Sequence, residues 1–391
     1  MRSLYDHSQI GLMKDLSLYI HIPFCSGHKC NYCSFVSFCN KRNDMEDYVR
    51  ALCEEIKLRS KQFGGEYSLA TIYFGGGTPS CLETGLITRI MLAIKENFKI
   101  KKTAEISIEC NPESLTREKL EEYKLNGINR LSIGVQSFSN GVLDFIGRSH
   151  TAKMAKDAII MAQKMGFENI SVDMMLGLPA QNDYDVSQMA KWLAKHNIKH
   201  ISAYSLILED GTPMKKLVDE GRLTVPTDDE TVDMYNSVYA VLKKYGYVRY
   251  EVSNFALPDY ECKHNIVYWT GKEYLGIGLA SHSYMSGKRF CNTEDFDKYV
   301  SNLMDKKLAV ESVETLSPAQ KREEEIMLAL RTNLGLDTYR LDRLYGGNFL
   351  KDKAKEIEFL SKNGFIRLEN GRIFVCDNAY YVLSSIISKL V

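Results

Sequence analysis

Hydrophobic residues between positions 17 and 208 form short runs rich in β-branched residues, separated by longer stretches with helical periodicity. The predicted strands cover residues 18–22, 70–74, 104–109, 130–135, 169–174 and 200–206. The predicted helices between them cover residues 44–62, 85–97, 117–126, 152–165 and 184–196. Strands joined by helix-length connections must pair in parallel, which predicts a wound sheet or a barrel. Six units are fewer than the eight of a complete barrel, so we expect an α/β fold built on a partial, TIM-like (β/α)6 barrel.

The pattern changes after residue 208, where a helix at 228–245 and a strand at 248–252 precede a segment rich in glycine and aromatic residues at 253–284. A second boundary falls at 311–316. Ser317, Pro318 and Gln320 then form a capping box that starts a helix, and further helices follow at 338–344, 349–363 and 380–390. Asn370-Gly371 predicts a hairpin between strands at 365–368 and 372–375. These elements indicate a winged-helix-like α+β domain.

We therefore expect two domains. The first covers residues 1–310, with the barrel at about 16–210 and an extension at about 211–310, and the second covers residues 311–391. A winged-helix shape raises the possibility of DNA binding. The helix at 349–363, however, alternates lysines with acidic residues, which is typical of a solvated face. We interpret this domain as structural or partner-binding.

The charge and the apolar pattern limit the functional classes. Fifty basic and fifty acidic side chains cancel, so no overall positive field favours nucleic acid. No apolar run approaches the ~20 residues of a membrane helix, and residues 1–15 do not read as a signal peptide. We expect a cytoplasmic protein with no membrane span, in which ten cysteines stay reduced.

Three of these cysteines, Cys25, Cys30 and Cys33, lie within nine residues directly after the first predicted strand. Such thiolates can bind zinc or an iron–sulfur cluster. Structural zinc needs four ligands, and Cys39, His28 or His21 could supply the fourth. An iron–sulfur cluster with three protein ligands leaves one iron open for a cofactor. The loop after a barrel strand is a typical position for such chemistry, which favours the cluster.

The stretch from Leu18 through Cys25 and Cys33 to Phe35 resembles the radical S-adenosylmethionine (SAM) superfamily, and within it the family of oxygen-independent coproporphyrinogen oxidases and HemW haem chaperones. The resemblance implies a [4Fe–4S] cluster on Cys25, Cys30 and Cys33, with SAM bound to the open iron. The family has three residues between the first two cysteines, whereas this chain has four. Gly27 lies among them and can accommodate the additional residue in a tight loop.

Polar residues and glycines at the ends of the later strands indicate a pocket at the barrel mouth. By resemblance, Gly76, Gly77 and Thr78 meet the amino group of SAM, and Arg148 pairs with its carboxylate. The resemblance further implies hydrogen bonds to SAM hydroxyls and amines from Glu109, Gln136 and Asp173, and packing of two tyrosines, Tyr19 and Tyr32, near the cofactor. Alone, each of these residues is equally consistent with a turn, a helix cap, an ion pair or the core.

Two features separate the branches of the family. The oxidases carry a further cysteine two residues after the third, where this chain has Phe35. The run His264-Asn-x-x-Tyr268-Trp269 resembles the haem chaperones. His264 could ligate haem iron, or it could be a buried histidine that stabilises a connection through Asn265.

The resemblance implies a haem chaperone that binds haem, the cluster and SAM and delivers haem to target haemoproteins. The alternative is an enzyme, a radical SAM oxidoreductase that decarboxylates coproporphyrinogen III to protoporphyrinogen IX. A nucleic-acid modifier is disfavoured by the balanced charge. The expected partners are haem or porphyrin, recipient haemoproteins and an electron donor, and the expected state is a monomer or a haem-dependent dimer.

Overall fold

The computed structural model describes residues 13–27, 29–39 and 41–391. Its six parallel strands confirm the partial (β/α)6 barrel. They are β1 (Lys14–Ile22), β2 (Tyr67–Gly76), β3 (Lys99–Cys110), β4 (Arg130–Gln136), β5 (Asn169–Leu176) and β6 (His200–Ser205), hydrogen-bonded in sequence order. All residues of β4 are buried. Both faces of this strand are therefore covered, although it contains the polar residues Ser132 and Gln136 as well as Leu131, Ile133 and Val135.

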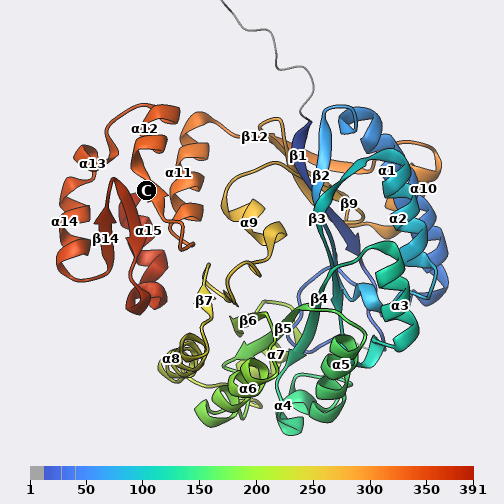
Figure 1. Ribbon diagram of the computed structural model, residues 1–391, viewed down its shortest axis with the longest axis horizontal. Coiled ribbons are helices and arrows are strands. Elements are labelled where there is room, and N and C mark those ends of the chain that lie inside the picture. The colour runs from blue at the N-terminus through green and yellow to red at the C-terminus, as the bar shows by residue number, and fades with distance from the viewer. Residues whose placement is uncertain (1–12, 28, 40) are drawn as a thin grey trace, which may run out of the picture.

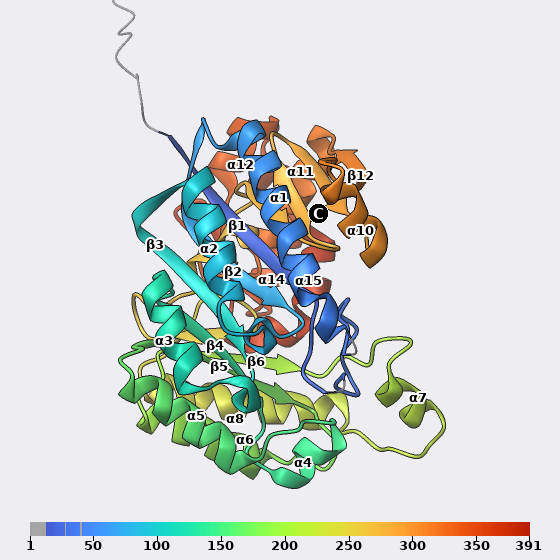
Figure 2. The same cartoon turned by 90° about the vertical axis from the view of Figure 1, so that its right-hand side faces the viewer.

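Helices cover the outer face of the sheet and leave its inner face toward the open side of the barrel (Figures 1 and 2). They are α1 (Met45–Phe63), α2 (Leu86–Asn97), α3 (Arg117–Asn126), α4 (Asn140–Phe145), α5 (Ala152–Lys164) and α6 (Asp183–Lys195). Between helices and sheet lies one large core of buried aliphatic and aromatic side chains, which holds the strand ends in fixed positions.

The extension adds helices and strands to both edges of the parallel sheet. The predicted strand at 248–252 is wrong in its extent, because β7 (Val248–Arg249) is followed by a separate β8 (Asn254–Ala256) on β6. On the other edge, β9 (Tyr274–Ile277) pairs in parallel with β1 and continues into antiparallel β10 (His282–Met285), β11 (Lys288–Asn292) and β12 (Val310–Thr315). The helices are α7 (Pro213–Asp219), α8 (Asp228–Lys244), α9 (Lys263–Trp269) and α10 (Phe296–Met304).

The C-terminal elements pack around a second hydrophobic core of their own. They comprise α11 (Pro318–Ala329), α12 (Thr338–Tyr345), α13 (Phe349–Asp352), α14 (Ala354–Lys362), α15 (Leu383–Leu390) and the sheet of β13 (Leu336–Asp337), β14 (Ile366–Glu369) and β15 (Arg372–Val375). The capping box at Ser317 and the Asn370-Gly371 hairpin are confirmed. The continuous helix predicted at 349–363 is wrong, because Lys353 leaves helical geometry and separates α13 from α14.

In Figure 1, α9 lies at the open side of the barrel, between the parallel strands and the C-terminal elements. It contacts β2 on one side and α11 on the other. Within the described residues, no helix combines the length and apolar composition needed to cross a membrane.

Candidate functional site

A cavity of about 380 Å³ opens at the carboxyl ends of the parallel strands. Most of the predicted site residues line it, namely Cys25, Cys30, Tyr32, Cys33, Gly76, Gly77, Thr78, Glu109, Gln136, Arg148 and Asp173. Residues from five strand ends therefore meet as the parallel topology predicts. Two predicted residues, Tyr19 and His264, do not line this cavity. We refer to it as the cysteine pocket.

Backbone hydrogen bonds within the cysteine loop fix its shape. Cys25 donates its N–H to the carbonyl of Phe38 at 3.0 Å, and the N–H of Cys33 reaches the carbonyl of Cys30 at 3.1 Å. Gly27 has a positive φ of 80° and open space around it, so this left-handed turn accommodates the longer spacer at low cost. Burial raises the pKa of the Cys30 and Cys33 thiols. Metal binding at these residues would therefore displace protons.

The alternative zinc site loses one of its candidate ligands. His21 hydrogen-bonds through Nδ1 to Tyr19 at 3.0 Å and through Nε2 to the carbonyl of Val36 at 3.2 Å, so neither ring nitrogen is free. Cys39 does not line the cysteine pocket, and His28 lies outside the described residues. Among the residues described, no three His, Cys, Asp or Glu side chains form a ready-made metal site; because this includes Cys25, Cys30 and Cys33, it favours neither zinc nor a cluster. Three thiols facing one cavity fit a cluster with an open iron better than closed, four-ligand zinc.

The glycine-rich end of β2 packs directly against the cysteine loop. Thr78 donates its N–H to the carbonyl of Phe24 at 2.7 Å. A Cβ on Gly77 would lie 2.5 Å from that same carbonyl oxygen and 3.1 Å from the sulfur of Cys25. Gly76 has φ +119°, and a Cβ there would meet the ring of His21 at 2.7 Å. No other residue type fits at Gly77 without moving the cysteine loop, or at Gly76 without moving the ring of His21 on β1.

Two carboxylates line the cavity from β3 and β5, on either side of β4. Glu109 accepts hydrogen bonds from the Tyr73 hydroxyl at 2.9 Å and the N–H of Gly76 at 3.2 Å. Burial raises its pKa to about 7. Asp173 accepts from Ser132 at 3.3 Å, and burial also raises its pKa. Both can receive hydroxyl or amine donors of a ligand.

Arg148 is the central cation of the pocket. It donates through Nη1 to Oδ1 of Asn111 at 2.9 Å and through Nη2 to the hydroxyl of Tyr32 at 2.8 Å, while its buried Nε has no partner among the described residues. Gln136 ends β4 at a positive φ of 67°, unusual outside glycine, which turns the chain at the cavity wall.

Sequence reasoning missed several residues that line the same cavity, among them Asn111, Ser26 and Tyr204. Asn111 follows directly after β3 and fixes Arg148. Its position directly after a predicted strand could have identified it as a pocket residue from the sequence. Ser26 lies inside the cysteine loop, and its buried hydroxyl has no partner among the described residues.

Tyr19 and His264 lie deeper in the barrel. Tyr19 stacks on Tyr73 with ring centroids 6.3 Å apart, and Tyr73 stacks on His264 at 5.0 Å. The ring nitrogens of His264 hydrogen-bond to Thr71 at 2.7 Å and to Tyr268 at 2.9 Å. Burial lowers the pKa of His264 to about 3. Because both ring nitrogens already have partners, the geometry supports a buried histidine that stabilises the fold rather than a haem ligand. Its partners are Thr71 and Tyr268, and not Asn265 as expected.

The chain matches known proteins along its length. Residues 19–193 match the Radical SAM superfamily, and residues 316–382 match the HemN C-terminal domain. It is 35% identical to the "Heme chaperone HemW" of Lactococcus lactis, over 97% of this chain and 98% of that protein. The protein of the same name from Bacillus subtilis is 33% identical, with 92% and 94% covered. The solved structure of coproporphyrinogen III oxidase (HemN) from Escherichia coli superposes with a TM-score of 0.83 at 24% identity, with 97% and 90% covered, and shows the same fold.

Proposed function

Because this chain belongs to the radical SAM superfamily and, within it, to the HemW family, we propose that it is a haem chaperone that takes up haem and delivers it to recipient haemoproteins. The observation that carries the proposal is the end-to-end similarity to relatives named heme chaperones, combined with a cysteine pocket suited to the cofactors of the superfamily. The His-Asn-x-x-Tyr-Trp run and the absence of a cysteine at Phe35 support the chaperone branch.

We assign the cluster to Cys25, Cys30 and Cys33, and SAM to the remainder of the cysteine pocket. When bound, the cluster supplies a redox-active iron with one open coordination position. The unpartnered Nε of Arg148 supports pairing with the SAM carboxylate, because a buried cation favours an anionic partner. Gly76, Gly77 and Thr78 offer backbone groups to the amino end. Glu109, Gln136 and Asp173 supply hydrogen bonds to hydroxyls and amines, and Tyr32 orients Arg148.

Tyr19 and His264 receive supporting roles in this proposal. Tyr19 packs beneath the pocket against Tyr73, the residue that holds Glu109. His264 fastens α9 to the barrel, so we do not assign it as a haem ligand. We further propose that the two domains meet between β12 and α11, a few residues after the expected boundary at 310, because β12 (Val310–Thr315) still pairs with β11 of the extension. Two separate hydrophobic cores support this division, with Ala309 in the first and Ile326 in the second.

The test begins with anaerobic reconstitution of the full chain with iron and sulfide, followed by electron paramagnetic resonance with and without SAM. We expect a [4Fe–4S] signal that SAM alters, and its loss in Cys30→Ala. The matched control, Cys53→Ala, removes a thiol on α1 away from the pocket and should retain the signal. Zinc in place of iron in wild-type protein would contradict the cluster assignment.

The second part of the test separates chaperone from oxidase. Reduced protein is incubated anaerobically with SAM and coproporphyrinogen III, and in parallel haem-loaded protein is mixed with an apo-haemoprotein. Transfer of haem without formation of protoporphyrinogen supports the chaperone. Formation of protoporphyrinogen IX would establish the oxidase instead.

A further inference from the structure

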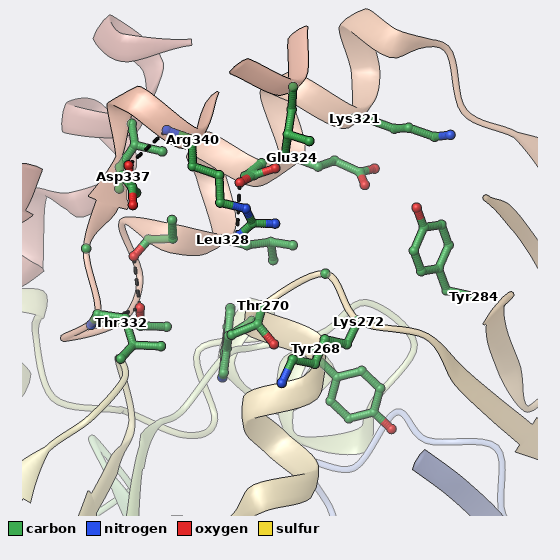
Figure 3. Close-up of a pocket in the computed structure, with 18 of the residues that line it drawn as sticks. Tyr268, Thr270, Lys272, Tyr284, Lys321, Glu324, Leu328, Thr332, Asp337 and Arg340 are labelled. Carbon is green, nitrogen blue, oxygen red and sulfur yellow. Dashed lines mark hydrogen bonds and ion pairs between the residues drawn. The ribbon is translucent and has the colours of Figure 1, made fainter. Parts of the chain in front are cut away.

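A second cavity of about 380 Å³ lies between the barrel extension and the C-terminal elements. Figure 3 shows α11, with Glu324 and Leu328, facing the C-terminal end of α9, with Tyr268, and the residues that follow it, with Thr270 and Lys272. Its lining shares no residue with that of the cysteine pocket. The register of β9 with β1 pairs Tyr274 with Ser17, whereas the cysteines follow the last residue of β1. The two cavities therefore lie toward opposite ends of the parallel strands. We refer to this second cavity as the interdomain cavity.

The two walls of the interdomain cavity have different apolar surfaces. The barrel side presents aromatic rings from Tyr268, Trp269, Tyr274 and Tyr284. The opposite side presents mainly aliphatic groups, such as Leu328 of α11, together with the ring of Tyr345 from α12. Flat aromatic surface facing aliphatic side chains favours a planar, largely apolar ligand, with a few polar groups to fix its orientation.

The charges of the lining favour an anion. Five basic and three acidic side chains line the cavity, leaving two positive charges in excess. Each acidic group pairs with an arginine: Glu324 with Arg289 at 2.6 Å, Glu325 with Arg340 at 3.5 Å and Asp337 with Arg372 at 2.8 Å.

Two lysines remain after these pairs are formed. Neither Lys272 nor Lys321 forms an ion pair with another described residue. Figure 3 places them on opposite walls, with Lys321 on the helical side and Lys272 below. A ligand carrying two carboxylates would complement both.

Resting on the proposed haem-chaperone function, we propose that the interdomain cavity is the tetrapyrrole site. The ring lies against the wall of Tyr268 and Trp269, and the two propionates pair with Lys272 and Lys321. A site open to solvent between two groups of elements suits a ligand that must be handed on.

His264 acts on this site as a positioning residue. Its Nε2 hydrogen-bonds to the Tyr268 hydroxyl at 2.9 Å, while Nδ1 is anchored on Thr71 of β2. The histidine thus sets the aromatic wall from inside the barrel without touching the ligand. The His-Asn-x-x-Tyr-Trp run therefore acts as a unit: His264 positions the aromatic wall, and Tyr268 and Trp269 form it.

The experiment titrates the full chain with haemin, protoporphyrin IX and protoporphyrin IX dimethyl ester, followed by Soret absorbance and tryptophan quenching. Because the propionates and the ring carry recognition, the iron-free acid should bind within about threefold of haemin, and the ester roughly tenfold or more weaker. Lys272→Ala/Lys321→Ala should weaken binding of the acid by about five- to thirtyfold, without weakening that of the ester. Rising salt should weaken binding of the acid only.

Two double variants serve as controls. Lys61→Ala/Lys164→Ala removes the same charge from exposed positions on α1 and α5 and should bind as wild type. Lys272→Arg/Lys321→Arg preserves the charges and should retain most of the affinity, which separates charge from folding. Retained protoporphyrin binding in Cys30→Ala supports a site apart from the cysteine pocket.

The failures of the two proposals are distinguishable. Wild-type affinity in the Lys272→Ala/Lys321→Ala variant, or equal binding of acid and ester, would overturn the interdomain site while leaving the haem chaperone intact. Loss of protoporphyrin binding in Cys30→Ala would also count against it. A wild-type chain that binds neither haemin nor protoporphyrin IX would refute the proposed function itself.

Discussion

Replacing Arg148 by glutamine should abolish most SAM binding while leaving the cluster in place. The guanidinium is held by Asn111 at 2.9 Å and by Tyr32 at 2.8 Å, and its third nitrogen, Nε, is buried without a partner among the described residues. The group is thus fixed before a ligand arrives, so little rotamer entropy is lost when a carboxylate binds. Arg148 itself is not among the proposed cluster ligands.

The magnitude follows from the burial of this pair. Removing one partner of a buried, hydrogen-bonded charge pair costs about 2 to 5 kcal/mol, partly because the other charge is left without a partner. The dissociation constant of SAM should therefore rise by roughly thirtyfold or more. The assay is isothermal titration of reconstituted protein with SAM under anaerobic conditions, with iron and sulfide content measured on the same sample.

The control is Arg222→Gln, which removes an exposed arginine whose ion-pair partner among the described residues is the nearby Glu220. It should bind SAM as wild type does. A SAM affinity for Arg148→Gln within threefold of wild type, with the cluster intact, would refute the assignment of Arg148 to the carboxylate. Loss of iron together with SAM would indicate that Arg148 acts on the cysteine loop through Tyr32.

Two further substitutions test the geometry around the pocket and the packing of the barrel. Gly77→Ala should lower iron, sulfide and SAM content together, because the added Cβ would lie 2.5 Å from the Phe24 carbonyl oxygen and displace the cysteine loop. Normal iron, sulfide and SAM content in this variant would contradict the reasoning. Glu55→Ala should lower the free energy of urea unfolding by about 3 to 5 kcal/mol, because it leaves buried Arg59 and the Tyr299 hydroxyl without their carboxylate partner. A change below about 1 kcal/mol would show that these buried contacts of Glu55 contribute little to stability.

The sequence was informative for the parallel strands, where short runs rich in β-branched and apolar residues recur between helix-length segments, and less so at the edges of the sheet. Strands β1 to β6 were predicted from such runs. By contrast, β11 and β12 carry charged residues and are partly exposed, so their pattern resembles a loop. Their strand conformation depends on pairing: β11 forms a hairpin with β10, and β12 pairs with β11 from a more distant part of the chain, which local propensity does not reveal.

The same distinction applies to the site residues. Residues after strand ends were predicted to meet because parallel strands end at one edge, and Glu109 does so. Tyr19 was misplaced because its depth depends on register: it lies level with Tyr73 and Ser107, two residues before Glu109, or about 7 Å deeper. His264 was ambiguous because no periodicity shows that α9 packs against the inner side of β2.

The raised pKa of Glu109 predicts a pH dependence of stability with a definite sign. The pKa is about 7 in the folded chain, against an ordinary value of 4.5, and burial is the main cause. Between these values the folded state binds more protons than the unfolded state, so the contribution of this group to stability falls as pH rises. From pH 5 to pH 8 this loss amounts to about 2.5 kcal/mol. The glutamine in Glu109→Gln cannot ionise, so this variant should not show that loss of stability.

The measurement is urea unfolding of the cofactor-free wild type and of Glu109→Gln at pH 5 and pH 8. Other titrating groups are common to both proteins, so the difference between them isolates Glu109. The variant should gain about 2.5 kcal/mol relative to wild type on going from pH 5 to pH 8, whatever its absolute stability at either pH. A pH-independent difference would mean that Glu109 ionises normally, with its carboxylate stabilised by the Tyr73 hydroxyl and the Gly76 N–H strongly enough to offset burial.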